Sequence, residues 1–346
     1  MLLVKNKLST ILLNDNHTLY DAINNLNKSG LKIVCIVDKK NFFIGIITDG
    51  DIRRAILKRY NLNSNVKKII NYSPIIYKDK INLLDIKKKI EKEDLDHLPI
   101  IIKKKIIGIY IKKENIFKNS LKKIDNVLVV MAGGLGKRLK PLTNNTPKAM
   151  LKYKGRPLTE YIINNGKKNG VNNFVLSIYY KKKIIKNYFK DGNSLDVNIS
   201  YLEEKKPLGT IGAISLLKRI HKSFFVFNCD SIVQINLKDL IRYHNKYNSI
   251  VTIVIKNFKY NNPYGVVKSL NHKFISFEEK PSTNFNINCG IYVFKPAVIK
   301  IIKNYKITNI IELINILQKK SHKISVYPIY ENWQDFGQNV ENLKAL

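Results

Sequence analysis

The feature that most restricts the fold is a run of apolar residues that leads directly into a glycine-rich loop. VLVVM occupies residues 127–131, and AGGLG follows at residues 132–136. A continuous apolar run of strand length predicts a strand buried on both faces, which is typical of parallel sheets. Glycines after such a strand let backbone N–H groups approach a phosphate closely, at the sheet edge where ligands bind. The segment therefore predicts a phosphate-binding loop in an α/β domain.

Segments typical of strands and helices alternate after this run. Apolar strand patterns and amphipathic helix patterns follow each other with short polar connections. The strand patterns are NNFVLSIYY (172–180), VNISYLEE (197–204) and FFVFNCD (224–230), and the helix patterns are PLTEYIINNGKKNG (157–170), KKIIKNYFKDG (182–192) and GTIGAISLLKRI (209–220). We therefore predict a doubly wound, Rossmann-like α/β domain with a mainly parallel sheet over residues 121–346.

An internal repeat precedes this domain. KIVCIVDKKNFFIGIITDGDIRRAI (32–56) is echoed by DHLPIIIKKKIIGIYIKKENIF (96–117), with Gly45 matching Gly108. Each unit has the pattern of an amphipathic helix, two apolar strands joined by a short turn, and a second helix. One such unit cannot bury its sheet faces alone, so the two are expected to pack together. Residues 1–120 are thus predicted to form a small α+β domain.

The chain carries a formal net charge of +35, which would suit a polyanionic partner such as nucleic acid. Only seven of its 61 basic residues are Arg, however, although phosphate and base recognition favours the forked guanidinium. The lysines are spread along the chain beside many Asn and Ile, a bias that AT-rich codons produce. No basic stripe is interleaved with aromatic residues. We therefore expect no nucleic-acid partner.

Cysteine usage and hydropathy indicate a reducing compartment. Cys35, Cys229 and Cys289 lie far apart and form neither a CxxC pair nor a metal-ligand spacing. The first ten residues hold too short an apolar run for a signal peptide, and no window approaches the ~18 apolar residues of a membrane span. We expect a cytoplasmic protein that does not associate with membranes.

The glycine loop carries candidate ligands for a nucleoside triphosphate. Gly133, Gly134 and Gly136 would bring backbone amides to the phosphates. Arg138 and Lys148 follow in the connection that leaves the strand, where they could hold a triphosphate from two sides. The spacing is neither that of a Walker A motif nor the GxGxxG of dinucleotide folds.

The whole stretch AGGLGKRLKPLTNNTPKAML resembles the signature of the sugar-1-phosphate nucleotidyltransferases, AGGxGTRLxPLTxxxPKxML. The resemblance implies the nucleotide-diphospho-sugar transferase fold, with an NTP on the glycine loop. Lys137 departs from the family, which usually has Thr at this position. A hydroxyl near the phosphates would then be missing, while the backbone contacts would remain.

The segment EEKKPLGTIGAI (203–214) resembles the family's EExPLGTAGAL, in which the loop and the helix start enclose the base. Gly209 and Thr210 would then lie against the nucleotide, with Thr210 a candidate helix N-cap. Glu204 is a carboxylate that suits the two adjacent N–H donors of guanine better than the single donor of uracil or thymine. The alternative for Glu204 is a solvated charge at a strand end.

Two carboxylates are candidates for binding Mg²⁺. Asp230 ends the apolar strand pattern FFVFNCD, and an acid at the carboxyl end of a buried strand is a natural ligand for a hard cation. The family resembled has an Asp here in N-G-D, where this chain has Cys229 in place of Gly. ENWQDFGQNVENL (331–343) resembles the family's WxDxGxxE element, which implies Asp335 as the second metal carboxylate.

Three further elements resemble the sugar side of the family's site. NPYGVV contributes Gly265, FEEKP contributes Glu279 and Lys280, and NINCGIYVF contributes Asn288 and Gly290. The resemblance implies contacts with the sugar hydroxyls and the sugar phosphate. A Glu can accept from two neighbouring hydroxyls, and a Lys supplies a point charge for phosphate.

The repeat at the front resembles a tandem pair of CBS motifs, regulatory modules that often bind adenosine nucleotides. In GIITDGDIRR, Thr48 and Asp51 stand where the family binds the ribose hydroxyls. The second repeat has Ile111 and Glu114 at the matching places, and Ile offers no hydroxyl. A CBS pair that serves only packing or dimerisation is the alternative.

The resemblance implies that an NTP and a sugar 1-phosphate react to give an NDP-sugar and pyrophosphate. Arg138 would hold the pyrophosphate, and Lys148 and Lys280 would orient the attacking phosphate. The order of the two domains resembles bacterial glucosamine-1-phosphate guanylyltransferases of the nonulosonic (legionaminic) acid pathway, which favours GTP. We also expect a homo-oligomer. Mannose or heptose 1-phosphate, a UTP- or dTTP-using relative, and an inactive nucleotide-binding protein are the alternatives.

Overall fold

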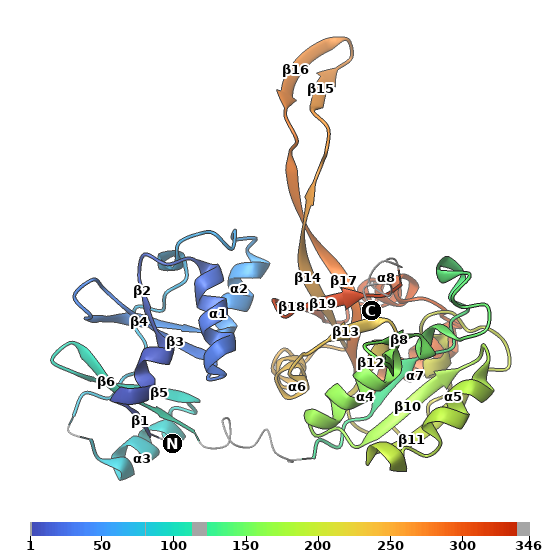
Figure 1. Ribbon diagram of the computed structural model, residues 1–346, viewed down its shortest axis with the longest axis horizontal. Helices are drawn as coiled ribbons and strands as arrows, with labels where there is room; N and C mark the ends of the chain where they lie inside the picture. Colours follow the sequence, from blue (N-terminus) through green and yellow to red (C-terminus); the bar gives the residue numbers. More distant parts are fainter. Residues whose placement is uncertain (1, 80, 113–122, 338–346) are drawn as a thin grey trace. The chain divides into compact units, whose positions relative to one another are not determined.

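The computed structural model describes residues 2–79, 81–112 and 123–337. The chain forms two compact units, Met1–Ser120 and Leu121–Leu346, and Figure 1 shows the elements of each. Within the described residues no helix is long and apolar enough to cross a lipid bilayer.

The first unit contains two three-stranded sheets, with strand orders β2-β3-β4 and β1-β6-β5. Each repeat contributes its antiparallel strand pair to one of them. The strands are β1 (Leu2–Val4), β2 (Leu12–Asn14), β3 (Ile33–Val37), β4 (Phe43–Thr48), β5 (His97–Ile102) and β6 (Lys105–Ile111), and the α-helices are α1 (Leu19–Ser29), α2 (Asp49–Leu57) and α3 (Leu83–Lys92).

The two repeats share one hydrophobic core. Cys35 of β3 and Ile109 of β6 belong to the same cluster of buried side chains, together with Leu8 and Ile11 from the 3₁₀ segment η1 (Lys5–Ile11). This packing gives each small sheet the apolar cover that it cannot provide for itself. The helix predicted after β6, including Glu114, lies outside the described residues.

The second unit is built on a seven-stranded sheet with the order β11-β10-β7-β12-β17-β14-β18. All neighbours are parallel except those of β17, which is antiparallel to both β12 and β14. The mainly parallel sheet predicted from the sequence is thus confirmed. Its strands are β7 (Leu128–Met131), β10 (Asn173–Ile178), β11 (Asn198–Glu203), β12 (Phe224–Asn228), β14 (Val251–Asn261), β17 (Ser282–Phe294) and β18 (Ile324–Ile329).

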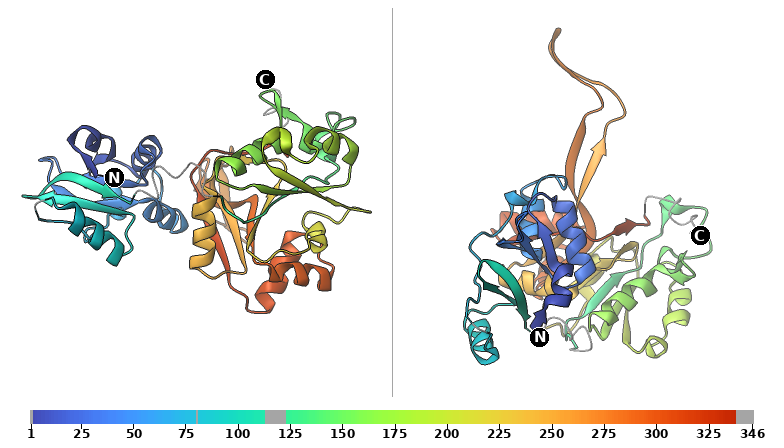
Figure 2. Two further views of the ribbon diagram at one scale, coloured as in Figure 1. Left: turned by 90° about the horizontal axis from the view of Figure 1, so that it is seen from below. Right: turned by 60° about the vertical axis from the view of Figure 1, so that its left-hand side comes forward.

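Helices cover both faces of this sheet, as Figure 2 shows. Leu128 and Val130 of β7 pack on one side, and Val129 and Met131 pack on the other, so the first strand is buried on both faces. The first face is covered by α4 (Leu158–Lys168), α5 (Lys182–Phe189) and α6 (Leu237–Lys246), and the second by α7 (Ala297–Tyr305), α8 (Ile310–Lys319) and the 3₁₀ helix η7 (Gly212–Leu216).

The prediction of a helix over residues 209–220 is wrong. Only the short 3₁₀ helix η7 forms there, and its N-cap is Ile211 without a side-chain hydrogen bond, so Thr210 is not a cap. The reason is a long-range contact, because the backbone N–H groups of Thr210 and Ile211 both donate to the carbonyl oxygen of Thr308. This contact holds the segment as a loop before a helix can begin.

Buried His244 of α6 gives the fold a measurable pH dependence. Its Nδ1 lies 2.8 Å from Thr252 Oγ1, and burial, with the charge of Lys295, lowers its pKa from 6.5 to about 4. The unfolded chain therefore binds this proton more readily, so the contribution of neutral His244 is full above pH 6.5 and lost as the pH falls to 4. At about 1.4 kcal/mol per pH unit, we expect a loss of roughly 3 kcal/mol.

Urea unfolding of the wild type and of His244→Asn between pH 7 and 4 measures this loss. The variant should lose less unfolding free energy than the wild type over that interval, because Asn does not titrate. The same loss in both proteins would show that other groups cause the pH dependence.

Candidate functional site

The glycine loop forms one wall of a pocket at the carboxyl edge of the sheet. The pocket has a volume of about 670 Å³, and the loop after β7 lines it together with Arg138 and Lys148. Gly136 has a φ of 61°, and a Cβ there would lie 2.7 Å from Thr143 Cγ2, so the tight turn requires glycine. Gly134 has open space around it. At its three glycines the loop thus presents backbone to the pocket.

Glu204 closes the pocket from the end of β11, and only 5% of its surface is exposed. Its Oε1 accepts a hydrogen bond from Ser177 Oγ, and its Oε2 accepts one from the Leu208 N–H, both at 2.8 Å. A Cβ on Gly133 would lie 2.5 Å from Oε1, so glycine is needed for the loop to pack against this carboxylate. The interpretation of Glu204 as a solvated charge is therefore wrong.

Asp230 and Asp335 meet in the pocket because two short strands pair. β13 (Ser231–Val233) and β19 (Trp333–Asp335) are antiparallel, with Ser231 opposite Asp335. A Cβ on Gly337 would lie 2.4 Å from Asp230 Oδ2 and 2.9 Å from Asp335 Oδ1. Two carboxylates 105 residues apart in the sequence thus come to the same point.

Lys148 is the counter-ion of this carboxylate pair. Its Nζ forms an ion pair with Asp230, from the 3₁₀ helix η5 (Lys148–Met150). Burial alone would lower the pKa of Lys148, but the acids beside it, including Asp230 and Asp335, outweigh burial and raise the pKa. Burial also raises the pKa of Asp335, and the neighbouring charge of Asp230 raises it further. The pair is therefore a site that attracts a cation.

The residues predicted for the sugar divide into two groups. Gly290 lies beside Asn228, which lines the pocket, since a Cβ on Gly290 would lie 2.5 Å from Asn228 Nδ2. Asn288, two residues before it, accepts from the Gly290 N–H and donates to the Tyr292 hydroxyl. The other residues lie on a long two-stranded extension and do not line the pocket; they are Gly265, Glu279 and Lys280.

Three residues that line the pocket or support it were not predicted from the sequence; they are Gly337, Asn228 and Ser177. Gly337 and Asn228 line the pocket, while Ser177 holds Glu204. Gly337 is the G of the WxDxG pattern, so this signal was present in the sequence. Ser177 lies inside a strand pattern, and no sequence motif indicated its role, because its hydrogen-bond partner Glu204 is 27 residues away.

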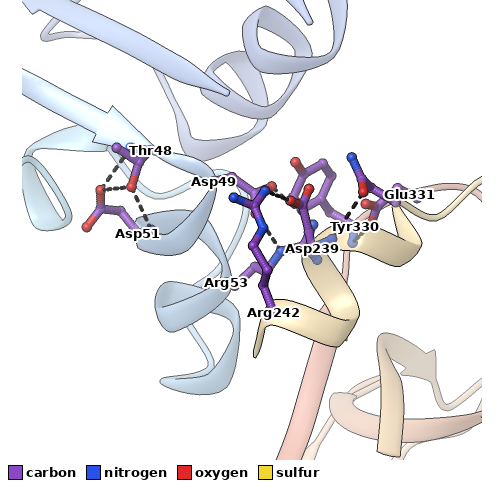
Figure 3. Close-up of polar contacts among 9 residues, drawn as sticks. Thr48, Asp49, Asp51, Arg53, Asp239, Arg242, Tyr330 and Glu331 are labelled. Atoms are coloured by element: carbon purple, nitrogen blue, oxygen red, sulfur yellow. Dashed lines mark hydrogen bonds and ion pairs between the residues drawn. The ribbon is translucent and has the colours of Figure 1, made fainter. Parts of the chain in front are cut away.

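Thr48 and Asp51 form the capping box of α2, as Figure 3 shows. Thr48 Oγ1 lies 2.6 Å from Asp51 Oδ2, which also accepts from the Thr48 N–H at 2.8 Å. Thr18 and Asp21 make the same box at α1. In the first repeat, these two candidate ribose ligands therefore already have a structural role in starting a helix.

Comparison with protein families finds a match in each part of the chain. The family model described as nucleotidyl transferase matches residues 127–345. The model described as CBS domain matches residues 9–58, which cover the first repeat.

Curated relatives are similar over the second unit. The mannose-1-phosphate guanyltransferase beta-B of Xenopus laevis is 29% identical over 227 residues, which are 63% of this chain and 63% of that protein. The mannose-1-phosphate guanyltransferase of Pichia angusta is 32% identical over 233 residues, 63% of this chain and 62% of that protein. The chain thus spans less than two thirds of the length of these relatives.

A solved structure shares the fold of this unit. It belongs to a candidate glucose-1-phosphate thymidylyltransferase from Bacillus anthracis, with a TM-score of 0.52 and 21% identity. The match covers 63% of this chain and 93% of that chain. At this level of identity the similarity concerns the fold alone.

Proposed function

Because the chain belongs to the nucleotidyl transferase family, we propose that its second unit transfers a nucleotidyl group from an NTP to a sugar 1-phosphate and releases pyrophosphate. The observation that carries this proposal is the meeting of Lys148, Asp230 and Asp335 beside a glycine loop in one pocket. Such a site can hold a polyphosphate and neutralise charge near its reacting phosphorus.

The pocket residues would act by alignment and charge neutralisation. An oxygen of the sugar phosphate attacks the α-phosphorus, and the bond to the pyrophosphate oxygen breaks, so no covalent enzyme intermediate is needed. Backbone amides of the glycine loop would bind the triphosphate. Arg138, exposed at the pocket rim, would hold the departing pyrophosphate, and Lys148 would orient the attacking phosphate.

The carboxylate pair fits a hard divalent cation. Asp230 and Asp335 place oxygens side by side, and no group of three His, Cys, Asp or Glu forms a metal cage within the described residues. Mg²⁺ is commonly held by one or two carboxylates plus substrate phosphates, so an open pair of this kind suits it. When bound, Mg²⁺ would supply positive charge at the reacting phosphates.

We favour GTP as the nucleotide. The curated relatives named above are guanylyltransferases, and Glu204 lines the pocket with carboxylate lone pairs that suit the N1–H and 2-amino donors of guanine. Each carboxylate oxygen of Glu204 already accepts one hydrogen bond from the protein. The N–H groups of guanine would therefore donate to the remaining lone pairs of these two oxygens.

A pyrophosphate-release screen tests the proposed function. The four common NTPs are paired with glucosamine, mannose, heptose and glucose 1-phosphates. GTP with one of the first three should react fastest, and a preference for UTP or dTTP would replace the guanylyl assignment. Absence of pyrophosphate release with every pair would favour an inactive nucleotide-binding protein.

The biosynthetic context is a further part of the proposal. A CBS domain in front of a transferase unit favours a guanylyltransferase that supplies nonulosonic (legionaminic) acid synthesis, with glucosamine 1-phosphate as the acceptor. The relatives make mannose 1-phosphate the second candidate. The screen separates the two, because each acceptor is assayed with the same nucleotide.

We also propose that the first unit binds an adenosine nucleotide through Thr48 and Asp51. Calorimetry with AMP and ATP should detect binding to the wild type, and Asp51→Ala should weaken it at least about tenfold by removing a charge-assisted hydrogen bond. Asp21→Ala is the matched control, since it breaks the same capping box at α1. Each variant should lose about 1 kcal/mol of stability. Equal nucleotide binding by the wild type and Asp51→Ala would refute this site.

A further inference from the structure

The ribbon of β14 and β17 continues beyond the seven-stranded sheet as a two-stranded arm, defined here as residues 258–285. At its tip, β15 (Val266–Leu270) and β16 (Lys273–Glu278) form a hairpin. Figures 1 and 2 show the arm projecting away from the sheet. A two-stranded ribbon is at best marginally stable alone in water, so an arm of this length needs something to pack against.

The surface of the arm is unusually apolar. Nine of its large hydrophobic side chains are at least half exposed, among them Tyr264 at 74%, Leu270 at 68% and Phe274 at 67%. Contiguous exposed apolar surface of this kind marks an interaction site. The arm also carries only four Lys against two Glu in a chain with a net charge of +35. The net charge of the arm is thus only +2, so electrostatic repulsion opposes its approach to a second copy of the chain only weakly.

The pocket described above does not by itself supply the charge that its substrates need. Three cationic and three carboxylate side chains line it, so their charges cancel; these are Lys137, Arg138, Lys148, Glu204, Asp230 and Asp335. Lys148 is also already paired with Asp230. Lys137 and Arg138 remain among the described cationic residues of the pocket, but the lining side chains together add no net positive charge for the triphosphate and the sugar phosphate, which are both anions.

The arm carries a suitable cation but holds it away from the pocket of its own chain. Lys280 is exposed at the bend between β16 and β17, beside Glu279. Asn288, at the base of the arm, is eight residues further along the chain, which corresponds to roughly 26 Å of extended strand. The register from Asn261↔Ser282 to Ile255↔Asn288 runs without a break. Lys280 therefore stays outside its own pocket while this ladder is intact.

We propose that two copies of this chain form a dimer in which the arm of each lies across the pocket of the other. Lys280 would then add its positive charge to that of Lys148 at the phosphate of the sugar 1-phosphate, and Glu279 would accept from the sugar hydroxyls. The exposed apolar side chains of the arm would be buried against the second copy. The role of Lys280 at the sugar phosphate rests on the proposed function, whereas the dimer does not.

Complementation between two inactive variants tests the exchange of arms. Asp230→Asn has a defective pocket and an intact arm, while Lys280→Met has an intact pocket and a defective arm. Each alone should release little pyrophosphate. After co-expression in equal amounts, half of the dimers are mixed and each has one complete site, so about one quarter of wild-type activity should return. Lys303→Met, an exposed change on α7, is the control and should retain full activity.

Sedimentation equilibrium tests the dimer without any substrate. The wild type should be a dimer, and the double variant Leu270→Asp/Phe274→Asp should be a monomer with an unchanged circular dichroism spectrum. A monomeric wild type, or an active wild type whose variants do not complement, overturns the proposal while leaving the proposed function intact. An inactive wild type that is still an arm-dependent dimer overturns the substrate role of Lys280 and supports the dimer.

Discussion

Replacing Asp230 with Asn is expected to lower the rate of pyrophosphate release at least about 100-fold, as for the loss of a major electrostatic group. Asn keeps the size of the side chain but removes the negative charge that pairs with Lys148 and meets Asp335. The site would then attract a divalent cation less strongly, and Lys148 would lose its partner. Turnover with saturating GTP, sugar 1-phosphate and Mg²⁺ measures the effect.

Asp125→Asn is the matched control for this change. Asp125 also pairs with a lysine, Lys222, but it is exposed and does not line the pocket. Its variant should keep wild-type turnover. Both variants should unfold near the wild-type temperature, which separates lost chemistry from lost folding. Near wild-type turnover of Asp230→Asn would remove this carboxylate from the proposed site.

Replacing Gly209 with Ala is expected to damage both stability and nucleotide use. Gly209 has a φ of 80°, and a Cβ there would lie 2.3 Å from the carbonyl oxygen of Thr308, which is backbone and cannot move aside easily. We expect a loss of about 2 kcal/mol, or roughly 4–8 °C in unfolding temperature. The loop lines the pocket, and its displacement should lower kcat/KM for the NTP about 100-fold.

Gly155→Ala separates the cost of the left-handed backbone conformation from the cost of the clash with Thr308. Gly155 has a similar φ of 77°, but a Cβ there would meet nothing within 4 Å. This variant should show only the cost of the left-handed backbone, about 1 kcal/mol, with unchanged kinetics. If Gly209→Ala is no more harmful than Gly155→Ala, the contact with Thr308 does not hold the nucleotide loop in place.

Part of the site could be predicted because it depends on local sequence. The buried strand β7, its glycine turn and an acid at the end of β12 are each encoded within a few residues, and the carboxyl ends of parallel strands meet at one edge of a sheet. Asp335 was different, since only a family resemblance connected it with Asp230. The pairing of β13 with β19 gives the physical reason why they meet.

Other features depend on contacts that no local pattern reports. The helix predicted over residues 209–220 failed because the carbonyl of Thr308, about a hundred residues later, holds the loop. Glu204 looked equally suited to a solvated strand end until Ser177 and the Leu208 N–H were seen to bond its two oxygens. Hydrogen bonds between distant segments decided both cases.

The sequence by itself determined the doubly wound class of the second unit, the repeat in the first and the identity of the phosphate loop, because periodicity and turn chemistry are local properties. Only the tertiary structure decided which charged side chains share a pocket. It placed Lys148 beside Asp230 and Asp335, and it carried Lys280 away on the arm. The electrostatic role of a side chain depends on its distance in space from other charges. Strand pairing determines these distances, whereas the spacing of residues along the sequence does not.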